Sequence, residues 1–341
     1  NTAQQFDYVF TTDIDCVQKY KEILQHNEVY LLPFAAQPKT HNPIELFERL
    51  DKFNFAGSYY LKYPVRQRDF ATLSEVAIDS KGLDIYDRNY DNDHPHYQFP
   101  DRYQSLILGA LPPEEIDRAY KGYEFGINMN TIKQSQTMFA RRVFEMLASN
   151  TVVLSNYSRG TRLFFGDLVI SSDHQQTLKD ALKPLLTDHF YRKKFKLEGL
   201  RKVFSEHTYA HRLAYILKKM KIEWEVPEKP QKIAVIAQCD TQAELSAIIS
   251  QFNAQTASHK ALLLLTNLPL EALKAANKTS NSASNSASNI ATYSDVESLL
   301  LAFKEGDYHY ASIFNCVNYY GPRYLEDLLH SYRYLQYHQS P

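Results

Sequence analysis

The chain has 341 residues, with 38 basic and 39 acidic side chains and a formal net charge of −1. This near balance leaves no global field that would attract nucleic acid or an anionic membrane surface. Apolar residues make up 44% of the composition, and the longest apolar run, residues 261–265, is too short to cross a bilayer. Conventional cores are therefore expected, in a protein that is soluble or peripheral to a membrane.

The first 41 residues have the pattern of the end of one domain. Residues 6–13 (FDYVFTTD) are typical of the last strand of an α/β domain, and a helix is expected near residues 17–24. No secretory signal pattern is visible. Because the chain begins abruptly with this strand, it is interpreted as an excised fragment. Residues 1–41 are thus interpreted as the remnant of a preceding α/β domain and an interdomain linker.

Residues 42–222 alternate short β-rich runs with amphipathic segments, as a doubly wound sheet requires. The expected strands are residues 54–57, 83–86, 123–128, 151–154 and 168–170. The expected helices are residues 44–52, 114–121, 137–148, 175–186 and 207–220. The pattern predicts a Rossmann-like α/β domain.

Within that domain, residues 123–160 place their polar side chains at the joints between strand, helix and strand. Ligands of open α/β sheets bind beyond the carboxyl ends of the strands, where helix N-termini offer free N–H groups to phosphate. Asn128 and Asn130 follow the first strand, and Ser155 and Asn156 follow the second. These four residues are predicted to supply neutral donors and acceptors to a nucleotide.

Thr137, Arg141 and Glu145 are spaced four residues apart, so on one helix they would line a single groove. A carboxylate there can accept two hydrogen bonds from a ribose diol, and Arg141 could meet a diphosphate. The alternative is that Arg141 and Glu145 form an ordinary i, i+4 pair on a solvated face.

The run RRVFEMLASNTVVLSNYSRG resembles the glycosyltransferases of the GT-B fold, in particular the group related to the spore-maturation protein CgeB and to bacterial surface-polysaccharide enzymes. The similarity covers roughly residues 6–220. It also includes the linker LLPFAAQP, the opening segment FAGSYYLKYPVRQRDF and the closing motif EHTYAHR.

This resemblance implies that Glu145 binds the ribose of a sugar nucleotide, as the second glutamate of the E-x7-E pattern. At the first glutamate position the chain has Thr137, which puts the stereochemistry and the donor in doubt. Gly57, Ser58 and Arg66 fall where such enzymes place a glycine-containing loop and a basic residue against the diphosphate. Glycine lets the backbone approach a ligand and arginine supplies a fixed positive fork, although the segment could also be a turn with solvated charges.

Histidines and cysteines suggest no metal centre in this half. Residues 88–104 are expected to form a long loop, in which His94 and His96 have no second cluster to complete a site. His207 and His211 are one helical turn apart, but packing or capping is the favoured interpretation. The three cysteines are widely separated and odd in number, which favours a reducing cytoplasm.

A proline-containing linker at residues 223–231 is expected to precede a second α/β module, residues 232–341. Its strands and helix are predicted at residues 232–239, 241–253 and 260–266, and its QFNAQT and NCVNYYGPRYLEDL segments resemble the GT-A family 2 glycosyltransferases. Asn315, Val317 and Asn318 stand where a D-x-D pair would hold Mg²⁺ or Mn²⁺. A divalent metal is thus expected only if a complete GT-A module exists.

Taken together, the sequence predicts a glycosyltransferase fragment that binds a nucleoside-diphosphate sugar and transfers a glycosyl group to a glycan or lipid-linked acceptor. The expected setting is the cytoplasm, with possible peripheral association with the inner membrane face through a synthase complex. No catalytic residue is assigned. The alternative is a noncatalytic scaffold of such a complex; an epimerase or dehydrogenase is disfavoured because no G-x-G-x-x-G follows an early strand.

Overall fold

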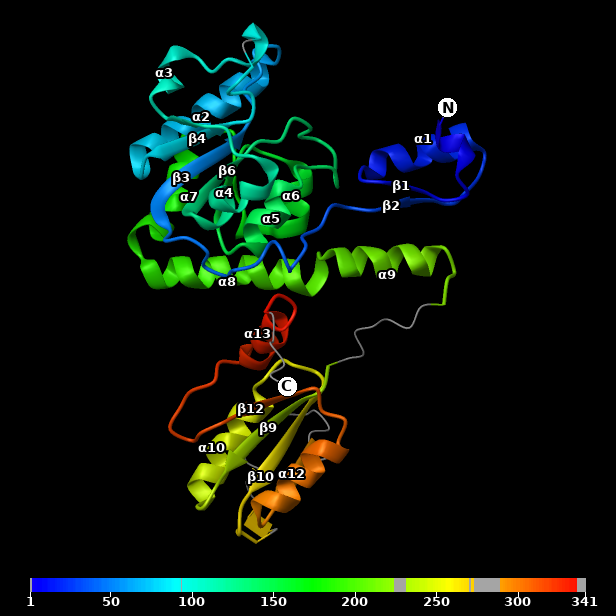
Figure 1. The fold of residues 1–341 in the computed structure, drawn as a ribbon, viewed down its shortest axis with the longest axis vertical. Helices are drawn as coiled ribbons and strands as arrows, with labels where there is room; N and C mark the ends of the chain where they lie inside the picture. The colour runs from blue at the N-terminus through cyan, green and yellow to red at the C-terminus, as the bar shows by residue number, and fades with distance from the viewer. Residues whose placement is uncertain (1, 93, 224–230, 270, 273–288, 336–341) are drawn as a thin grey trace. The chain divides into compact units, whose positions relative to one another are not determined.

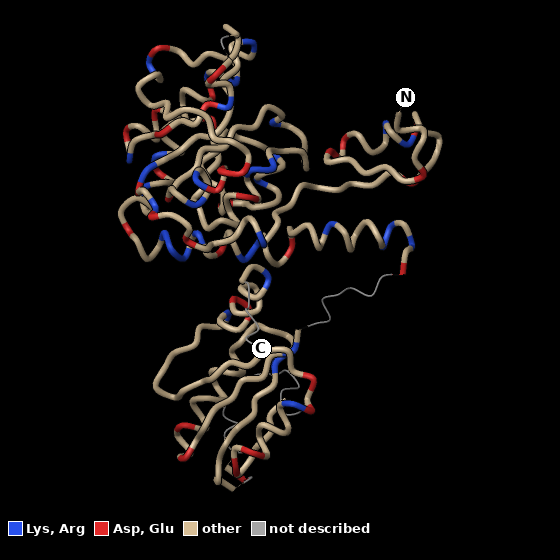
Figure 2. The backbone as a smooth tube through the Cα atoms, viewed as in Figure 1, with Lys and Arg blue, Asp and Glu red and all other residues tan. Residues whose placement is uncertain are grey.

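The computed structural model describes residues 2–92, 94–223, 231–269, 271–272 and 289–335. The chain divides into two compact units, residues 1–224 and 225–341 (Figure 1). Basic and acidic residues are interspersed along both units, in keeping with a net charge near zero (Figure 2). Any strongly charged site must therefore be local.

A six-stranded sheet is the framework of the first unit. Its strands are β3 (Leu50–Gly57), β4 (Leu83–Asp87), β5 (Ile107–Gly109), β6 (Tyr123–Asn128), β7 (Val152–Ser155) and β8 (Ile170–Ser171). The strand order is β5-β4-β3-β6-β7-β8, and every pair is parallel. The chain thus builds outward from β3 on one side and from β6 on the other, which is the topology of a Rossmann-like doubly wound fold. The predicted fold class is confirmed.

The central strands are short runs with apolar residues that are covered on both faces. β4 and β7 are buried along their whole length. At the centre, the rings of Phe53 on β3 and Phe125 on β6 stack with centroids 4.6 Å apart, and both are fully buried. This packing holds together β3 and β6, the two strands between which the strand order reverses.

The helices between the strands are partly as predicted. They are α2 (Pro64–Ser80), α3 (Asp101–Gln104), α4 (Asp117–Lys121), α5 (Arg142–Ala148), α6 (Arg159–Phe165), α7 (Gln175–Thr187), α8 (His189–Glu206) and α9 (Tyr209–Lys219). The predicted helices at 175–186 and 207–220 match α7 and α9, and α4 with a preceding 3₁₀ turn accounts for residues 114–121. No helix was predicted for α2, α6 or α8, although Pro64 at the first position of α2 is a common helix start.

The helix predicted at residues 44–52 is wrong, because β3 already begins at Leu50 and residues 44–49 are not helical. Arg49 holds this segment against the sheet. Its guanidinium donates to the carbonyl oxygens of Tyr123 and Ser149 at 2.9 and 2.6 Å and to Thr151 Oγ1 at 3.0 Å. These long-range bonds outweigh the local helical pattern.

The amino-terminal segment contains β1 (Val9–Thr11), α1 (Ile14–Leu24) and β2 (Val29–Leu31), and β1 and β2 pair in parallel. The following linker is tied to the start of α9. Ala36 forms an isolated bridge with Thr208, and Arg212 donates to the carbonyl oxygens of Pro33 and Phe34, both at 2.9 Å. The entry and exit segments of the six-stranded domain therefore meet.

His207, between α8 and α9, is buried in a cage of Phe144, Phe164 and Phe165, with ring centroids 5.4–5.5 Å away. Arg212 Nη2 donates to its Nδ1 at 3.0 Å, which favours the neutral ring. Burial, with a contribution from the charge of Arg212, lowers the pKa of His207 to about 4. The closing histidine therefore has a packing role in the fold.

This depressed pKa predicts a loss of stability in acid. The unfolded chain takes up a proton at His207 near its ordinary pKa of 6.5, whereas the folded chain does so only near 4. The free energy of unfolding should therefore fall as the pH decreases through this window, by up to about 3 kcal/mol. Urea unfolding of the native chain and of His207→Phe, at about pH 7 and about pH 4.5, should show a smaller loss in the variant. Equal losses would contradict the assignment.

The second unit is a smaller parallel α/β structure. Its elements are β9 (Ile233–Gln238), α10 (Gln242–Asn253), β10 (Lys260–Leu265), β11 (Ile290–Tyr293), α12 (Val296–Glu305), β12 (Tyr310–Ile313) and α13 (Tyr324–Ser331). The strand order is β11-β10-β9-β12, with all pairs parallel. The predicted elements at 232–239, 241–253 and 260–266 are confirmed to within a residue at each end. Of the predicted linker, residues 224–230 lie outside the described residues, as do residues 277–288 of the serine- and asparagine-rich segment.

Candidate functional site

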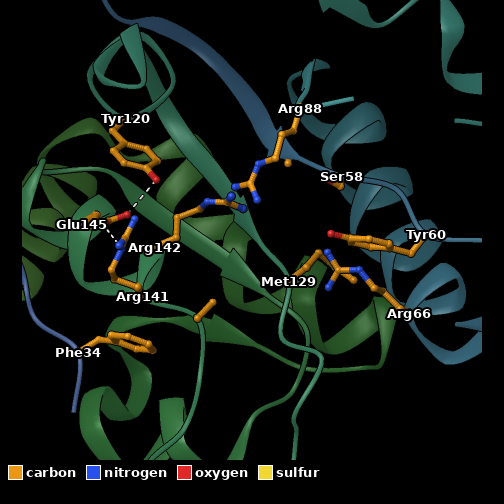
Figure 3. Close-up of a pocket in the computed structure, with 12 residues that line it drawn as sticks. Phe34, Ser58, Tyr60, Arg66, Arg88, Tyr120, Met129, Arg141, Arg142 and Glu145 are labelled. Atoms are coloured by element: carbon orange, nitrogen blue, oxygen red, sulfur yellow. Dashed lines mark hydrogen bonds and ion pairs between the residues drawn. The ribbon is translucent and has the colours of Figure 1, made fainter. Parts of the chain in front are cut away.

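A pocket of about 310 Å³ lies at the carboxyl ends of β3 and β6 (Figure 3). These are the two strands between which the sheet order reverses, and this is where open α/β sheets bind their ligands. The pocket is lined by Phe34, Gly57, Ser58, Tyr60, Arg66, Arg88, Tyr120, Met129, Ala140, Arg141, Arg142 and Glu145. Five of the residues predicted from the sequence are thus brought together: Gly57, Ser58, Arg66, Arg141 and Glu145.

One wall of the pocket is the turn from β3 into α2. Gly57 ends β3, and a Cβ atom there would lie 2.8 Å from Cζ of Phe55, so a larger residue would displace a buried ring. Arg66 lies in the first turn of α2, where Nη1 donates to Thr131 Oγ1 at 3.2 Å and the guanidinium lies 5.2 Å from the ring centroid of Tyr60. These contacts hold the Arg66 side chain beside the pocket.

The opposite wall holds Glu145, whose carboxylate is buried and has a partner at each oxygen. Arg141 Nε lies 2.6 Å from Oε1, and the Tyr120 hydroxyl donates to Oε2 at 2.9 Å. His41 Nε2 lies 3.8 Å from Oε1, and burial lowers the pKa of His41. The pKa of Tyr120 is raised to about 12, chiefly by burial, so it remains a donor to Glu145 at neutral pH. The predicted Arg141–Glu145 pair exists, but its carboxylate lines a pocket and is not on a solvated face.

Three further guanidinium groups give the pocket a local excess of positive charge. Within the described residues, no carboxylate forms an ion pair with Arg66, Arg88 or Arg142, and Arg142 Nε is buried without a hydrogen-bond partner. Burial lowers the pKa of Arg66, and the charge of Arg142 adds to this shift. Figure 3 shows Arg88 and Arg142 extending toward one another in the middle of the pocket. An anion in this position would relieve their mutual repulsion.

The predicted place of Thr137 is wrong, because α5 begins only at Arg142 and residues 137–141 are not part of it. Ser135 Oγ accepts from the backbone N–H groups of Thr137 and Met138, which bends the chain into a loop. Thr137 Oγ1 donates to the carbonyl oxygen of Thr12 and accepts from the N–H of Ile14, both at 2.9 Å. Thr137 therefore ties this loop to the amino-terminal segment and does not line the pocket.

Asn128, Asn130, Ser155 and Asn156 do not line the pocket either, but form a buried network behind it. Asn156 Oδ1 accepts from the N–H of Asn130 at 2.8 Å, and Asn156 Nδ2 donates to the carbonyl of Asn130 at 2.9 Å and to Asp69 Oδ2 at 2.8 Å. The side chains of Asn128 and Asn130 both donate to Ser155 Oγ. Asn130 Oδ1 in turn accepts from the N–H of Ala140 at 2.9 Å. The network thus anchors both ends of the loop that leads to Arg141 and Arg142.

The sequence interpretation missed Arg88 and Arg142. Arg88 directly follows β4, which is next to β3 in the sheet, and Arg142 is the second arginine of a doublet. A signal was present in each case: a basic residue at the carboxyl end of a strand, and a basic pair before an apolar helix. The strand order needed to bring them together is not visible in the sequence alone.

In the parts of the chain that the structure describes, no group of three or more His, Cys, Asp or Glu side chains is arranged to hold a metal ion. The rings of His94 and His96 lie 5.0 Å apart in the loop after β4, and His211 Nδ1 accepts from the N–H of Thr208 at the start of α9. In the second unit, Asn315 Oδ1 accepts from the N–H of Val317 within the turn after β12. These side chains have local structural partners.

Residues 45–218 match the family described as glycosyl transferase-like, and this span is just over half of the chain. The chain belongs to the glycosyl transferase-like family. The matched span includes the whole six-stranded sheet and every pocket residue except Phe34, so the pocket belongs to the glycosyl transferase-like domain.

Three solved structures illustrate the similarity of fold. A glycosyltransferase from Rickettsia africae has a TM-score of 0.47 and 13% identity, with 65% of this chain and 67% of that chain covered. Sucrose-phosphate synthase from Thermosynechococcus elongatus has a TM-score of 0.46 and 13% identity, with 63% and 58% covered. A mutant of S. aureus TarM, in complex with fondaparinux, α-GlcNAc-glycerol and UDP, has a TM-score of 0.45 and 12% identity, with 64% and 44% covered.

The chain thus spans less than half of TarM and somewhat more than half of sucrose-phosphate synthase. No curated protein matches it at a significant level. Among the residues described, no helix has the length and apolar character needed to span a membrane.

Proposed function

We propose that the pocket between β3 and β6 binds a nucleoside-diphosphate sugar, and that the complete protein transfers the glycosyl group to a hydroxyl of a glycan or lipid-linked acceptor. The observation that carries this proposal is the convergence of Arg66, Arg88 and Arg142 at the switch point of a glycosyl transferase-like domain, with no carboxylate among the described residues paired to any of them. A diphosphate would supply the negative charge that is missing beside these three guanidinium groups.

The arginines would act mainly on the leaving group. As the bond from the sugar to the diphosphate breaks, negative charge grows on the departing phosphate oxygen, and fixed cations stabilise that charge. Arg142 is well suited to this role, because its guanidinium contacts the Tyr120 hydroxyl and the face of Phe55 and keeps a free donor. Because Arg141 is already paired with Glu145, we propose that Arg88 and Arg142, with Arg66, hold the diphosphate and that Arg141 orients Glu145.

Glu145 is proposed to accept hydrogen bonds from the ribose hydroxyls. Tyr120 and Arg141 fix its two oxygens from the protein side, so the carboxylate is held in one orientation before a ligand arrives. A preorganised charged acceptor contributes more to affinity than a mobile one because less entropy is lost on binding.

The Glu145→Gln variant should separate the ribose role from a merely structural one. Calorimetric titration with UDP, GDP, CDP and ADP, with and without magnesium, would first identify the nucleotide. The variant should then bind this nucleotide about tenfold more weakly, because a charged acceptor is replaced by a neutral one. Its affinity for the 2′-deoxy form should change much less. An equal loss for both forms, or no loss, would show that Glu145 does not contact the ribose hydroxyl.

The finer parts of the function remain proposals. We propose assembly of a surface polysaccharide or a teichoic-acid-like glycan, peripheral association with the inner membrane face through a synthase complex, and no metal requirement in the first unit. The second unit has the parallel sheet of a nucleotide-binding half, but Asn315, Val317 and Asn318 in place of carboxylates offer poor ligands for a divalent cation.

The second candidate function is a noncatalytic scaffold of a glycan synthase complex. The observation that favours it is Thr137, which stands where the E-x7-E pattern of the resemblance has its first glutamate and is bonded to Thr12 and Ile14. The same titration distinguishes the two functions. A scaffold would bind none of the four nucleotides. A donor-binding domain would bind at least one, and substitutions in the pocket would weaken that binding.

A further inference from the structure

A cluster of aromatic rings extends from the pocket onto the surface. It consists of Tyr60, Tyr63, His94, His96 and Tyr97, here called the aromatic rim. The ring centroid of Tyr60 lies 6.2 Å from that of Tyr63 and 5.6 Å from that of Tyr97. The ring centroid of His94 lies 5.4 Å from that of Tyr97 and 5.0 Å from that of His96. The rings thus form a connected series and not scattered surface residues.

Three residues of the aromatic rim are exposed and Tyr60 and Tyr97 are half-buried, and backbone hydrogen bonds hold the two loops that carry them. Tyr63 is 44% exposed, and both histidines are also exposed. The N–H of Leu61 donates to the carbonyl of His96 at 2.9 Å, and the N–H of His96 donates to His94 Nδ1 at 3.2 Å. Rings that are held in place but left open to solvent are typical of a binding surface, because a packed core would cover them.

Tyr60 joins the aromatic rim to the pocket. Its ring lines the pocket and lies beside Arg66, while its edges meet Tyr63 and Tyr97 outside. Figure 3 shows Tyr60 and Glu145 at opposite sides of the pocket, with Arg88 and Arg142 between them. If Glu145 holds the ribose and the arginines hold the diphosphate, the aromatic rim begins at the end where the transferred sugar lies.

We propose that the aromatic rim binds the acceptor glycan, with sugar rings stacked on Tyr63 and Tyr97 and their chain leading to the donor at Tyr60; this rests on the proposed function of the pocket. The faces of pyranose rings expose C–H groups, which pack on the electron-rich faces of aromatic rings, while the sugar hydroxyls remain in water. The occupant is thus an oligosaccharide of several residues. A single sugar would cover only one ring of the series.

The test uses the full 341-residue chain and three defined probes, maltohexaose, cellohexaose and chitohexaose, observed by saturation-transfer difference NMR. At least one probe should receive saturation at millimolar concentration. Tyr63→Ala and Tyr97→Ala should each weaken this binding about tenfold, the effect of removing one stacking ring. Tyr90→Ala is the matched control: Tyr90 is 57% exposed on the same loop, and within the described residues it has no ring contact with the aromatic rim.

Nucleotide titration of the same variants keeps this proposal separate from the proposed function. Loss of the oligosaccharide signal in Tyr63→Ala and Tyr97→Ala, with nucleotide affinity unchanged, would support the aromatic rim as the acceptor site. Nucleotide binding with no saturation of any probe, or equal loss in Tyr90→Ala, would overturn it. If the chain binds no nucleotide but binds an oligosaccharide through Tyr63 and Tyr97, the glycan site would be supported and the proposed donor site would be contradicted.

Discussion

Replacing Arg142 by Met should weaken nucleotide binding about 100-fold, the largest functional effect we expect from a single change in the pocket. The reason is the state of this side chain: its guanidinium is partly buried and meets the Tyr120 hydroxyl and the Phe55 ring, and among the residues described its Nε has no hydrogen-bond partner. The proposed diphosphate would supply this partner, and a charge-assisted bond in a desolvated site is among the stronger polar contacts in proteins.

The measurement is calorimetric titration with the nucleotide identified for the native chain. Arg162→Met is the matched control, because Arg162 is a half-exposed arginine on α6 that pairs with Asp167 outside the pocket. Arg141→Met should have a smaller effect than Arg142→Met, since Arg141 is already neutralised by Glu145. If Arg142→Met binds as tightly as the native chain while circular dichroism shows it folded, the diphosphate does not lie between Arg88 and Arg142.

Replacing Asn156 by Ala should lower the free energy of unfolding by about 3 kcal/mol, the largest stability effect expected from a single polar residue of the site. Asn156 satisfies both backbone groups of Asn130 and one oxygen of Asp69, and the side chain is almost fully buried. Its loss leaves the backbone N–H and carbonyl of Asn130 without their side-chain partner where water does not easily reach, whereas Asp69 Oδ2 still accepts from Lys133.

Two measurements test the expected loss of stability in Asn156→Ala. Urea unfolding should show a lower midpoint, and hydrogen exchange should become faster in residues 129–141, because Asn130 no longer fixes the N–H of Ala140. Ser171→Ala is the control: it removes one bond to the carbonyl of Asn156 and leaves the amide in place. An unchanged exchange rate in residues 129–141 would mean that the network does not hold the loop that leads to Arg142.

Much of the fold could be predicted from hydrophobic runs. The strand at residues 123–128 coincides with β6, and the strands of β4, β7 and β9 were placed within a residue or two, because buried parallel strands are short apolar segments with polar ends. The error at residues 137–148 has a physical cause. The apolar spacing there is helical, but the hydroxyls of Ser135 and Thr137 bind backbone groups, some of them more than 120 residues away, and the helix forms only after Arg141.

The site could be predicted only in part for a related reason. Gly57, Arg66 and Glu145 are close to recognisable local patterns, and all three line the pocket. Arg88 joins them only because β4 is next to β3 in the sheet, and a sequence does not state which strands are neighbours. Conversely, Asn128 and Asn156 stand at strand ends as ligand-binding residues do. Yet the Asn128 side chain donates to Ser155, and the Asn156 side chain bonds to Asn130 and Asp69.

The bridge between Ala36 and Thr208 has a consequence for how this domain can be exchanged during evolution. Because the chain enters and leaves the six-stranded domain at the same corner, the intervening residues form a closed cassette that contains every strand of the sheet and both walls of the pocket. Recombination at these two points would transplant the complete six-stranded domain into another protein and require only one new junction surface. A host chain could thus acquire the pocket and the aromatic rim together, because Tyr60, Tyr63 and Tyr97 lie between the same two points.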